Sequence, residues 1–144
     1  RYYKGSKKII EVGHKLMDNY NIDFELIENM EHDALIKKKM NCDILIDQVG
    51  DRGGWGYGMS SVESMAMGTC CATQINDKLN NMIPDHPFLN ITEDNMYIKL
   101  SEIIENRPEL EERKRQSYDW VYQNHDMNNV IKNIYSLYNS LKYD

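Results

Sequence analysis

Residues 42–73, CDILIDQVGDRGGWGYGMSSVESMAMGTCCAT, contain the pattern that decides the fold. They begin with an apolar run of strand length at 42–47 and end with another at 69–73. Between the two runs a glycine-rich loop leads into a short helical pattern at 59–67, and Gly68 follows as a residue suited to end a helix. Strand, helix and strand in this order, with near-continuous apolar strands, predict a parallel sheet covered on both faces.

The rest of the chain continues this alternation and ends in helices. Apolar residues recur at helical spacing after Ser6, a good N-cap, and Pro108 stands where the first turn of another helix is expected. The polar, proline-bearing segment 74–87 is expected to be a connection. The predicted class is therefore α/β with a parallel sheet and a helical C-terminus. We expect helices at about 6–19, 31–40, 93–105, 108–125 and 127–142, and strands at 23–28 and 88–91.

Composition limits the classes of partner. The chain has 144 residues, enough for one domain, and 17 Lys and Arg against 23 Asp and Glu give a net charge of −6. This balance argues against a nucleic-acid surface. No apolar run approaches the ~20 residues that a membrane span needs. The three cysteines and four histidines lack metal-ligand spacing, so we expect no metal and a reduced, cytoplasmic setting.

The glycine loop is the candidate ligand site. It leaves the carboxyl end of the strand at 42–47, where open parallel sheets bind their ligands. The free N–H groups of Met59, Ser60 and Ser61 would suit a phosphate. Glu63, on the first turn of the helix, would accept hydrogen bonds from a neighbouring diol such as a ribose. From spacing alone, a surface turn beside a solvated acid is an equal alternative.

Other side chains near the loop have two interpretations each. Asp47, at the strand end, could line a site, although an aspartate there also commonly caps a loop. Trp55 and Tyr57 could wall a pocket, but aromatic rings in a glycine loop more commonly pack the loop onto the sheet. The three lysines at 37–39 are expected to form a solvated helix end.

Two segments resemble a known family. DILIDQVGDRGGWGYGMSSVESMAMGTC, residues 43–70, resembles the donor-site segment of family 4 glycosyltransferases of the GT-B fold, in which a Gly-aromatic-Gly loop leads into a helix of the form Glu-Ala-Met-Ala-x-Gly. RYYKGSKKIIE, residues 1–11, resembles the Arg…Lys-Gly segment that opens the C-terminal half of those enzymes. The resemblance implies one Rossmann-like, three-layer domain over 1–144 that binds a nucleotide-sugar. The first strand and the acceptor-binding half would lie upstream of Arg1, so that the chain is a fragment of a longer protein.

The resemblance also implies an enzyme that transfers a sugar from a UDP- or GDP-linked donor to an acceptor hydroxyl, with retention of configuration and no separate cofactor. Lys4 would neutralise the diphosphate leaving group and Glu63 would hold the ribose, as the two catalytic residues. Trp55 stands where many members carry the first of two glutamates, so the identity of the sugar and the stereochemical outcome stay open. The implied donor-binding residues are Arg1, Lys4, Gly58, Met59, Ser60 and Glu63.

The expected partners are a nucleotide-sugar and the upstream acceptor-binding half, through which contact with a membrane surface stays open. The chain alone should bind the donor without turning it over. Two alternatives remain. One is a nucleotide-sugar epimerase or hydrolase of the same architecture, and the other is a non-catalytic Rossmann-like interaction module.

Overall fold

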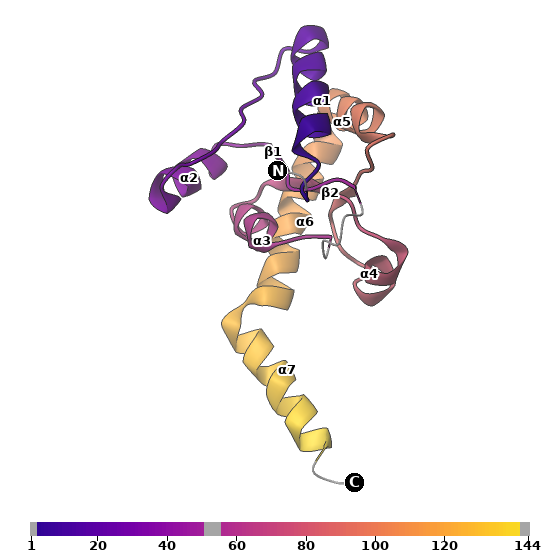
Figure 1. The fold of residues 1–144 in the computed structure, drawn as a ribbon. Helices are drawn as coiled ribbons and strands as arrows, with labels where there is room; N and C mark the ends of the chain where they lie inside the picture. Colours follow the sequence, from indigo (N-terminus) through magenta and orange to yellow (C-terminus); the bar gives the residue numbers. More distant parts are fainter. Residues whose placement is uncertain (1–2, 51–55, 142–144) are drawn as a thin grey trace.

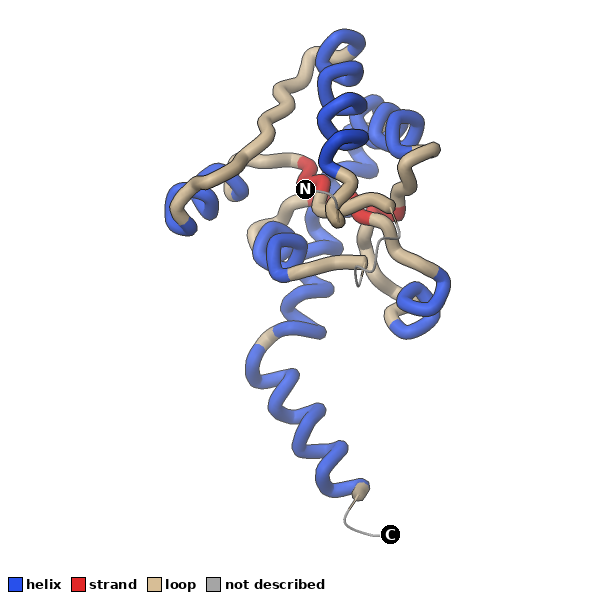
Figure 2. Tube along the Cα trace, viewed as in Figure 1, coloured by secondary structure: helices blue, strands red, loops and turns tan. Residues whose placement is uncertain are grey.

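Three short strands form a parallel sheet at the centre of the computed structural model, which describes residues 3–50 and 56–141 (Figures 1 and 2). The strands are β1 (Ile44–Ile46), β2 (Cys70–Thr73) and β3 (Leu89–Asn90), and they lie side by side in that order. In the register, Ile44 stands opposite Cys70 and Ala72 stands opposite Leu89. The predicted α/β class with a parallel sheet is therefore confirmed.

The described part of the chain contains seven helices besides these strands. The helices at 6–19, 31–40, 59–67 and 108–125 match their predicted positions to within one or two residues, and Gly68 has the positive φ of 78° that ends a helix in the left-handed conformation. The structure gives α1 (Ser6–Asn19), α2 (His32–Lys39), α3 (Met59–Ala66), α4 (Asp77–Met82), α5 (Met96–Glu105), α6 (Arg107–His125) and α7 (Met127–Ser140).

One face of the sheet is covered by α1 and α5. Cys70 and Ala72 of β2 point into a core that these helices complete, because strand residues two apart share a face. Figure 1 shows α1 and α5 together on this side of the strands. The apolar side chains that they contribute are Ile9, Val12 and Leu16 from α1 and Met96, Leu100 and Ile103 from α5.

The opposite face is covered by α3 and α6. Cys71, the strand residue between the other two, lies in a second core with Met65 of α3 and with Trp120 and Val121 of α6. All four residues of β2 are buried, so this strand has an apolar cluster on each side. This arrangement confirms that the sheet is covered on both faces.

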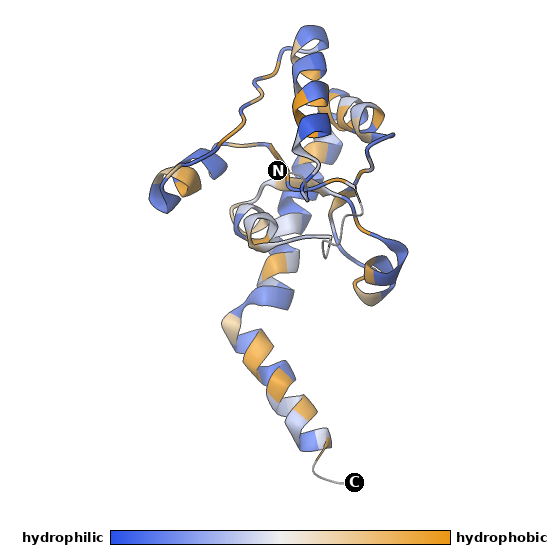
Figure 3. Cartoon of the chain, in the orientation of Figure 1, coloured by the Kyte–Doolittle hydropathy of each residue, from blue (hydrophilic) through white to orange (hydrophobic). Residues whose placement is uncertain are grey.

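The last helix, α7, extends away from the rest of the molecule (Figure 1), and none of its residues is buried. Its N-cap is Asp126, whose side chain accepts hydrogen bonds from the backbone N–H groups of Asn128 and Asn129. Apolar residues recur along the helix, where Figure 3 shows orange segments, and their side chains are exposed. They are Met127, Val130, Ile131, Ile134, Tyr135, Leu137, Tyr138 and Leu141.

The predicted strand at 23–28 is wrong. These residues form an irregular connection between α1 and α2 (Figure 1). An alternating pattern provides only a local preference, and a strand also needs a neighbouring strand with which to pair. Phe24 instead packs against Gly13, where an added Cβ would lie 2.7 Å from the ring.

The helices differ from the predictions at three places, two of them at a helix start and one where a helix was not predicted. The N-cap of α1 is Gly5, with a φ of 65°, and Ser6 is the first helical residue. The segment 74–87 contains α4, capped by Asn76, whose side chain accepts from the N–H of Leu79. The helix expected from 93 begins at Met96, because Thr92 and Asn95 exchange two hydrogen bonds in a preceding turn.

Within residues 3–50 and 56–141, every helix is too short or too polar to cross a bilayer.

Candidate functional site

The candidate site lies at the carboxyl end of β1, at the start of α3. β1 ends at Ile46, and the N–H of Asp47 still bonds to the carbonyl of Ala72, so the sheet holds Asp47 in place. Gly58 is the N-cap of α3. The structure therefore places the strand end and the helix start next to each other, as the sequence predicts.

Asp47 is the polar centre of this corner. Its side chain is only 2% exposed and accepts hydrogen bonds from three groups. These are the ammonium of Lys4, the hydroxyl of Ser61 and the backbone N–H of Gly58, the last at 3.2 Å. A buried carboxylate needs such donors, because burial without them is costly. Asp47 thus joins the N-terminal segment, β1 and α3.

Lys4 keeps access to solvent although it is paired with Asp47. Its side chain is 52% exposed. Its backbone is fixed as well, because the carbonyl of Lys4 accepts from the N–H of Val49 at 3.2 Å. An ammonium has three N–H donors, and the pair with Asp47 uses one of them. The side chain can therefore donate to a further anion from a fixed position.

The first turn of α3 supplies backbone donors. The N–H of Gly58 is occupied by Asp47. The amides of Met59, Ser60 and Ser61 belong to the first turn, where no carbonyl of the same helix can reach them. The side chain of Met59 is exposed and Ser60 is half-buried, so this end of the helix faces solvent. Such a terminus favours a negative charge.

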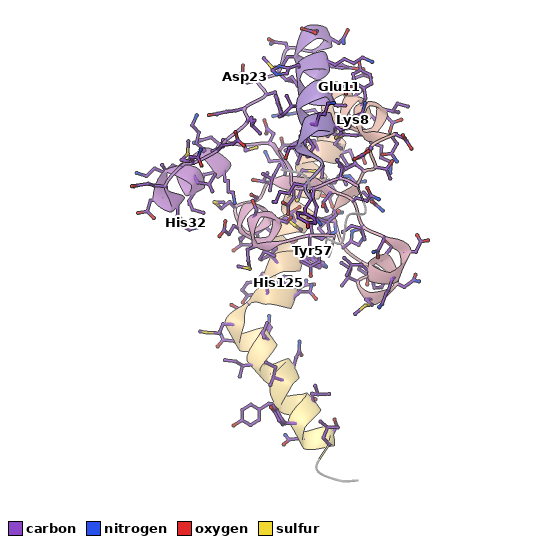
Figure 4. All side chains as sticks on the ribbon, viewed as in Figure 1. Lys8, Glu11, Asp23, His32, Tyr57 and His125 are labelled. Carbon is purple, nitrogen blue, oxygen red and sulfur yellow. The ribbon has the colours of Figure 1, made fainter. Side chains whose placement is uncertain are left out.

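Glu63 faces α2 and pairs with two of its side chains. Its Oε2 lies 2.8 Å from Nζ of Lys39, and its Oε1 lies 3.3 Å from Nε2 of His32. Figure 4 shows His32 on α2, beside the helix that carries Glu63. The hydrogen bond from Lys39, followed by the one from His32, holds the pKa of Glu63 below its ordinary value. The carboxylate is therefore ionised at neutral pH and held in position.

The prediction of a solvated helix end at 37–39 is wrong for Lys39. The lysines at 37–39 were expected to form a solvated helix end, yet Lys39 is only 4% exposed. Lys38 does face solvent and pairs with Glu25. The run of identical residues gives no signal that one of them is turned inward, because the difference depends on the contacts that Lys39 makes with Glu63 and Ser60 of α3.

The aromatic side of the loop packs into the core. Tyr57 lies against Phe88 and Trp120, with ring centroids 4.9 and 5.7 Å apart, and His125 is 6.0 Å away. Figure 4 shows Tyr57 and His125 near each other, where α6 leads into α7. Burial raises the pKa of Tyr57. The packing role expected for Tyr57 is confirmed, whereas Trp55 lies outside the described residues.

A pocket of about 350 Å³ opens between α3 and the end of α6. Its walls are mainly aliphatic and aromatic, and Glu63 lies on its border. It is separate from the polar corner around Asp47, none of whose residues lines it. The lining residues are Val62, Glu63, Ala66, Tyr118, Val121, Tyr122, His125 and Asp126.

The predicted site residues thus fall into three groups. Lys4 and Gly58 meet at Asp47, and Met59 and Ser60 follow directly on the first turn of α3. Glu63 lies one turn further along and pairs with α2. Arg1 lies outside the described residues.

Sequence reasoning missed His32 and Lys39 and gave Asp47 only a minor role. Within the described ranges, no group of three His, Cys, Asp or Glu side chains could hold a metal ion.

No family model, curated protein or solved structure matches the chain. Its class is therefore defined by the structure itself: an α/β protein with a three-stranded parallel sheet, a helical C-terminus and a polar corner at a strand end.

Proposed function

We propose that the chain is the nucleotide-sugar-binding half of a glycosyltransferase, with a Rossmann-like domain equivalent to the C-terminal half of the GT-B fold. One observation carries the proposal. Lys4 and the open first turn of α3 meet at the carboxyl end of β1, and an ionised Glu63 lies one helical turn away. This combination suits a diphosphate joined to a ribose. The likeness of residues 1–11 and 43–70 to the donor segments of family 4 glycosyltransferases supports the same assignment.

The diphosphate would bind to the amides of Met59 and Ser60 and to the ammonium of Lys4. In the reaction, an acceptor hydroxyl attacks the anomeric carbon of the donor sugar, and the bond from that carbon to the diphosphate oxygen breaks. Negative charge then grows on the leaving diphosphate. Fixed donors that face this charge lower the barrier without having to reorganise. Asp47 contributes by keeping Lys4 in place before the donor binds.

Glu63 would accept hydrogen bonds from the ribose hydroxyls. Each carboxylate oxygen can accept two hydrogen bonds, and one position on each oxygen is taken by Lys39 or His32. Counting the partners among the described residues, one position on each oxygen remains for a ligand. The acceptor-binding half and the group that accepts the hydroxyl proton are expected in a part of the protein upstream of this chain.

Calorimetry with UDP and with GDP tests the proposal. We expect one of the two to bind to the wild-type chain, and Lys4→Gln to weaken that nucleoside diphosphate far more than the corresponding nucleoside. A charged hydrogen bond is worth about 1.5–3 kcal/mol, which is about a tenfold to hundredfold change in Kd. Lys7→Gln, on the exposed side of α1, is the matched control. If neither nucleotide gives heat at millimolar concentration, the proposal fails, and the non-catalytic interaction module becomes the favoured alternative.

A further inference from the structure

Lys39 is a buried cation that the proposed function does not yet use. It is the last residue of α2 and is only 4% exposed. Lysine is almost never fully buried unless it has a partner, because removing an ammonium from water is costly. The position of Lys39 therefore depends on the groups that surround its Nζ.

Those groups all belong to α3. Nζ of Lys39 lies 2.8 Å from Oε2 of Glu63 and 3.4 Å from the carbonyl oxygen of Ser60. The backbone of Lys39 is held too, because its carbonyl accepts from the hydroxyl of Thr69 at 3.4 Å. Figure 1 shows α2 set to one side of the sheet, so this lysine reaches from an outlying helix to the start of α3.

The pair restricts the carboxylate of Glu63. The terminal torsion of a glutamate is broad, so an unpaired carboxylate samples many orientations. Lys39 fixes Oε2, while the weaker contact with His32 at 3.3 Å is on Oε1. With respect to the side chains that the structure describes, one acceptor position stays open on each oxygen. Two neighbouring acceptors fixed side by side match two neighbouring hydroxyls.

We propose that Lys39 is a positioning residue, which orients Glu63 so that its two oxygens accept from the two hydroxyls of a ribose at once. The inference rests on the proposed function, because it presumes a nucleotide bound beside Glu63. Its consequence is selectivity. The chain should prefer a ribonucleotide to its 2′-deoxy form, and that preference should depend on Lys39.

The test compares Kd values for UDP and 2′-deoxy-UDP, or for the guanine pair if GDP is the better ligand. In the wild-type chain we expect UDP to bind about tenfold more tightly than 2′-deoxy-UDP, the value of one charged hydrogen bond. Lys39→Met, which keeps an unbranched apolar stem, should reduce the ratio to about one or two. Lys39→Arg keeps the charge, so its ratio should lie between those of Lys39→Met and the wild-type chain.

Lys38→Met is the matched control. Lys38 is the neighbouring residue on the same helix and pairs with the exposed Glu25, so the wild-type ratio should persist. A purely structural role for Lys39 would lower the melting temperature of Lys39→Met and leave the ratio unchanged. A folded Lys39→Met that still prefers UDP tenfold would therefore overturn the inference and leave nucleotide binding intact. A wild-type chain that binds no nucleotide overturns both.

If Lys39→Met does not fold, a measurement on the wild-type chain can still test the positioning role of Lys39. A buried, paired ammonium exchanges its protons slowly and is visible in ¹H–¹⁵N NMR spectra of lysine side chains. We expect the Lys39 signal to persist when UDP is added, because the ribose uses the remaining acceptor positions of Glu63. Loss of the signal on binding would show that nucleotide displaces Lys39, which contradicts a positioning role.

Discussion

Asp47 illustrates what a single residue contributes at the strand end. It is buried, and it accepts from a lysine, a serine and a backbone amide that come from two separate segments of the chain. The polar residue after an apolar run could be predicted to lie at the sheet edge, since parallel strands end there. Its partners could not, because residues 43 positions apart in sequence meet only through the packing of the N-terminal segment.

The ionisation of Glu63 should make the free energy of unfolding depend on pH. Its pKa is lowered in the folded chain, mainly by Lys39, so its contribution is present above the ordinary value of 4.5 and is lost as pH falls through the lower, folded value. Glu63→Gln lacks this contribution at every pH. We therefore expect the wild-type chain to be more stable than Glu63→Gln at pH 7, and the difference to shrink steadily below about pH 4.5.

Urea unfolding of both proteins between pH 7 and pH 3 measures that difference. A difference that stays constant across the range would show that the carboxylate charge is not what stabilises the pair.

The helices were easier to predict than the strands, for a physical reason. Helix hydrogen bonds are local, so spacing and caps near Ser6 and Pro108 located α1 and α6 almost to the residue. Strand formation depends on a partner, and the alternating segment 23–28 lacks one in the described structure. The missed helix α4 is only one or two turns long, and its signal reduces to the Asn76 cap.

The contact between Gly13 and Phe24 joins α1 to the irregular segment that replaces the predicted strand. A Cβ at Gly13 would lie 2.7 Å from three ring atoms of Phe24. Alanine gains about 1 kcal/mol of helix propensity over glycine, but overpacking typically costs about 1–3 kcal/mol. We expect Gly13→Ala to destabilise the chain on balance, as measured by urea unfolding.

A double-mutant cycle with Phe24→Leu separates the two effects. In the Phe24→Leu background the ring is gone, so Gly13→Ala should become neutral or stabilising. If Gly13→Ala costs the same in both backgrounds, the ring contact is not the cause.

At the scale of the molecule, α7 contributes little to the core. None of its residues is buried, and its apolar side chains are exposed along its length. The periodic apolar stripe predicted the helix correctly. It also suggested that the helix packs on its apolar side, but within the described structure nothing covers that side. A chain that ends at Asp126 should therefore lose less than about 1 kcal/mol of unfolding free energy, in the range of surface changes.

Thermal unfolding followed by circular dichroism compares the truncated and full chains. A large fall in the melting temperature would mean that α7 folds back onto the body in solution.

The neighbouring thiols of β2 give the two apolar clusters separate chemical reporters. Cys70 belongs to the core with α1 and α5, and Cys71 to the core with α3 and α6. Burial raises the pKa of Cys70 to about 11 and raises that of Cys71 as well, so neither thiol is reactive at neutral pH while its cluster is closed. Pulsed alkylation followed by mass spectrometry would then measure the labelling rate of each thiol, and hence how fast each side of the sheet opens. Equal labelling rates would indicate one cooperative unit, and a faster Cys70 would identify the α1–α5 side as the first to separate.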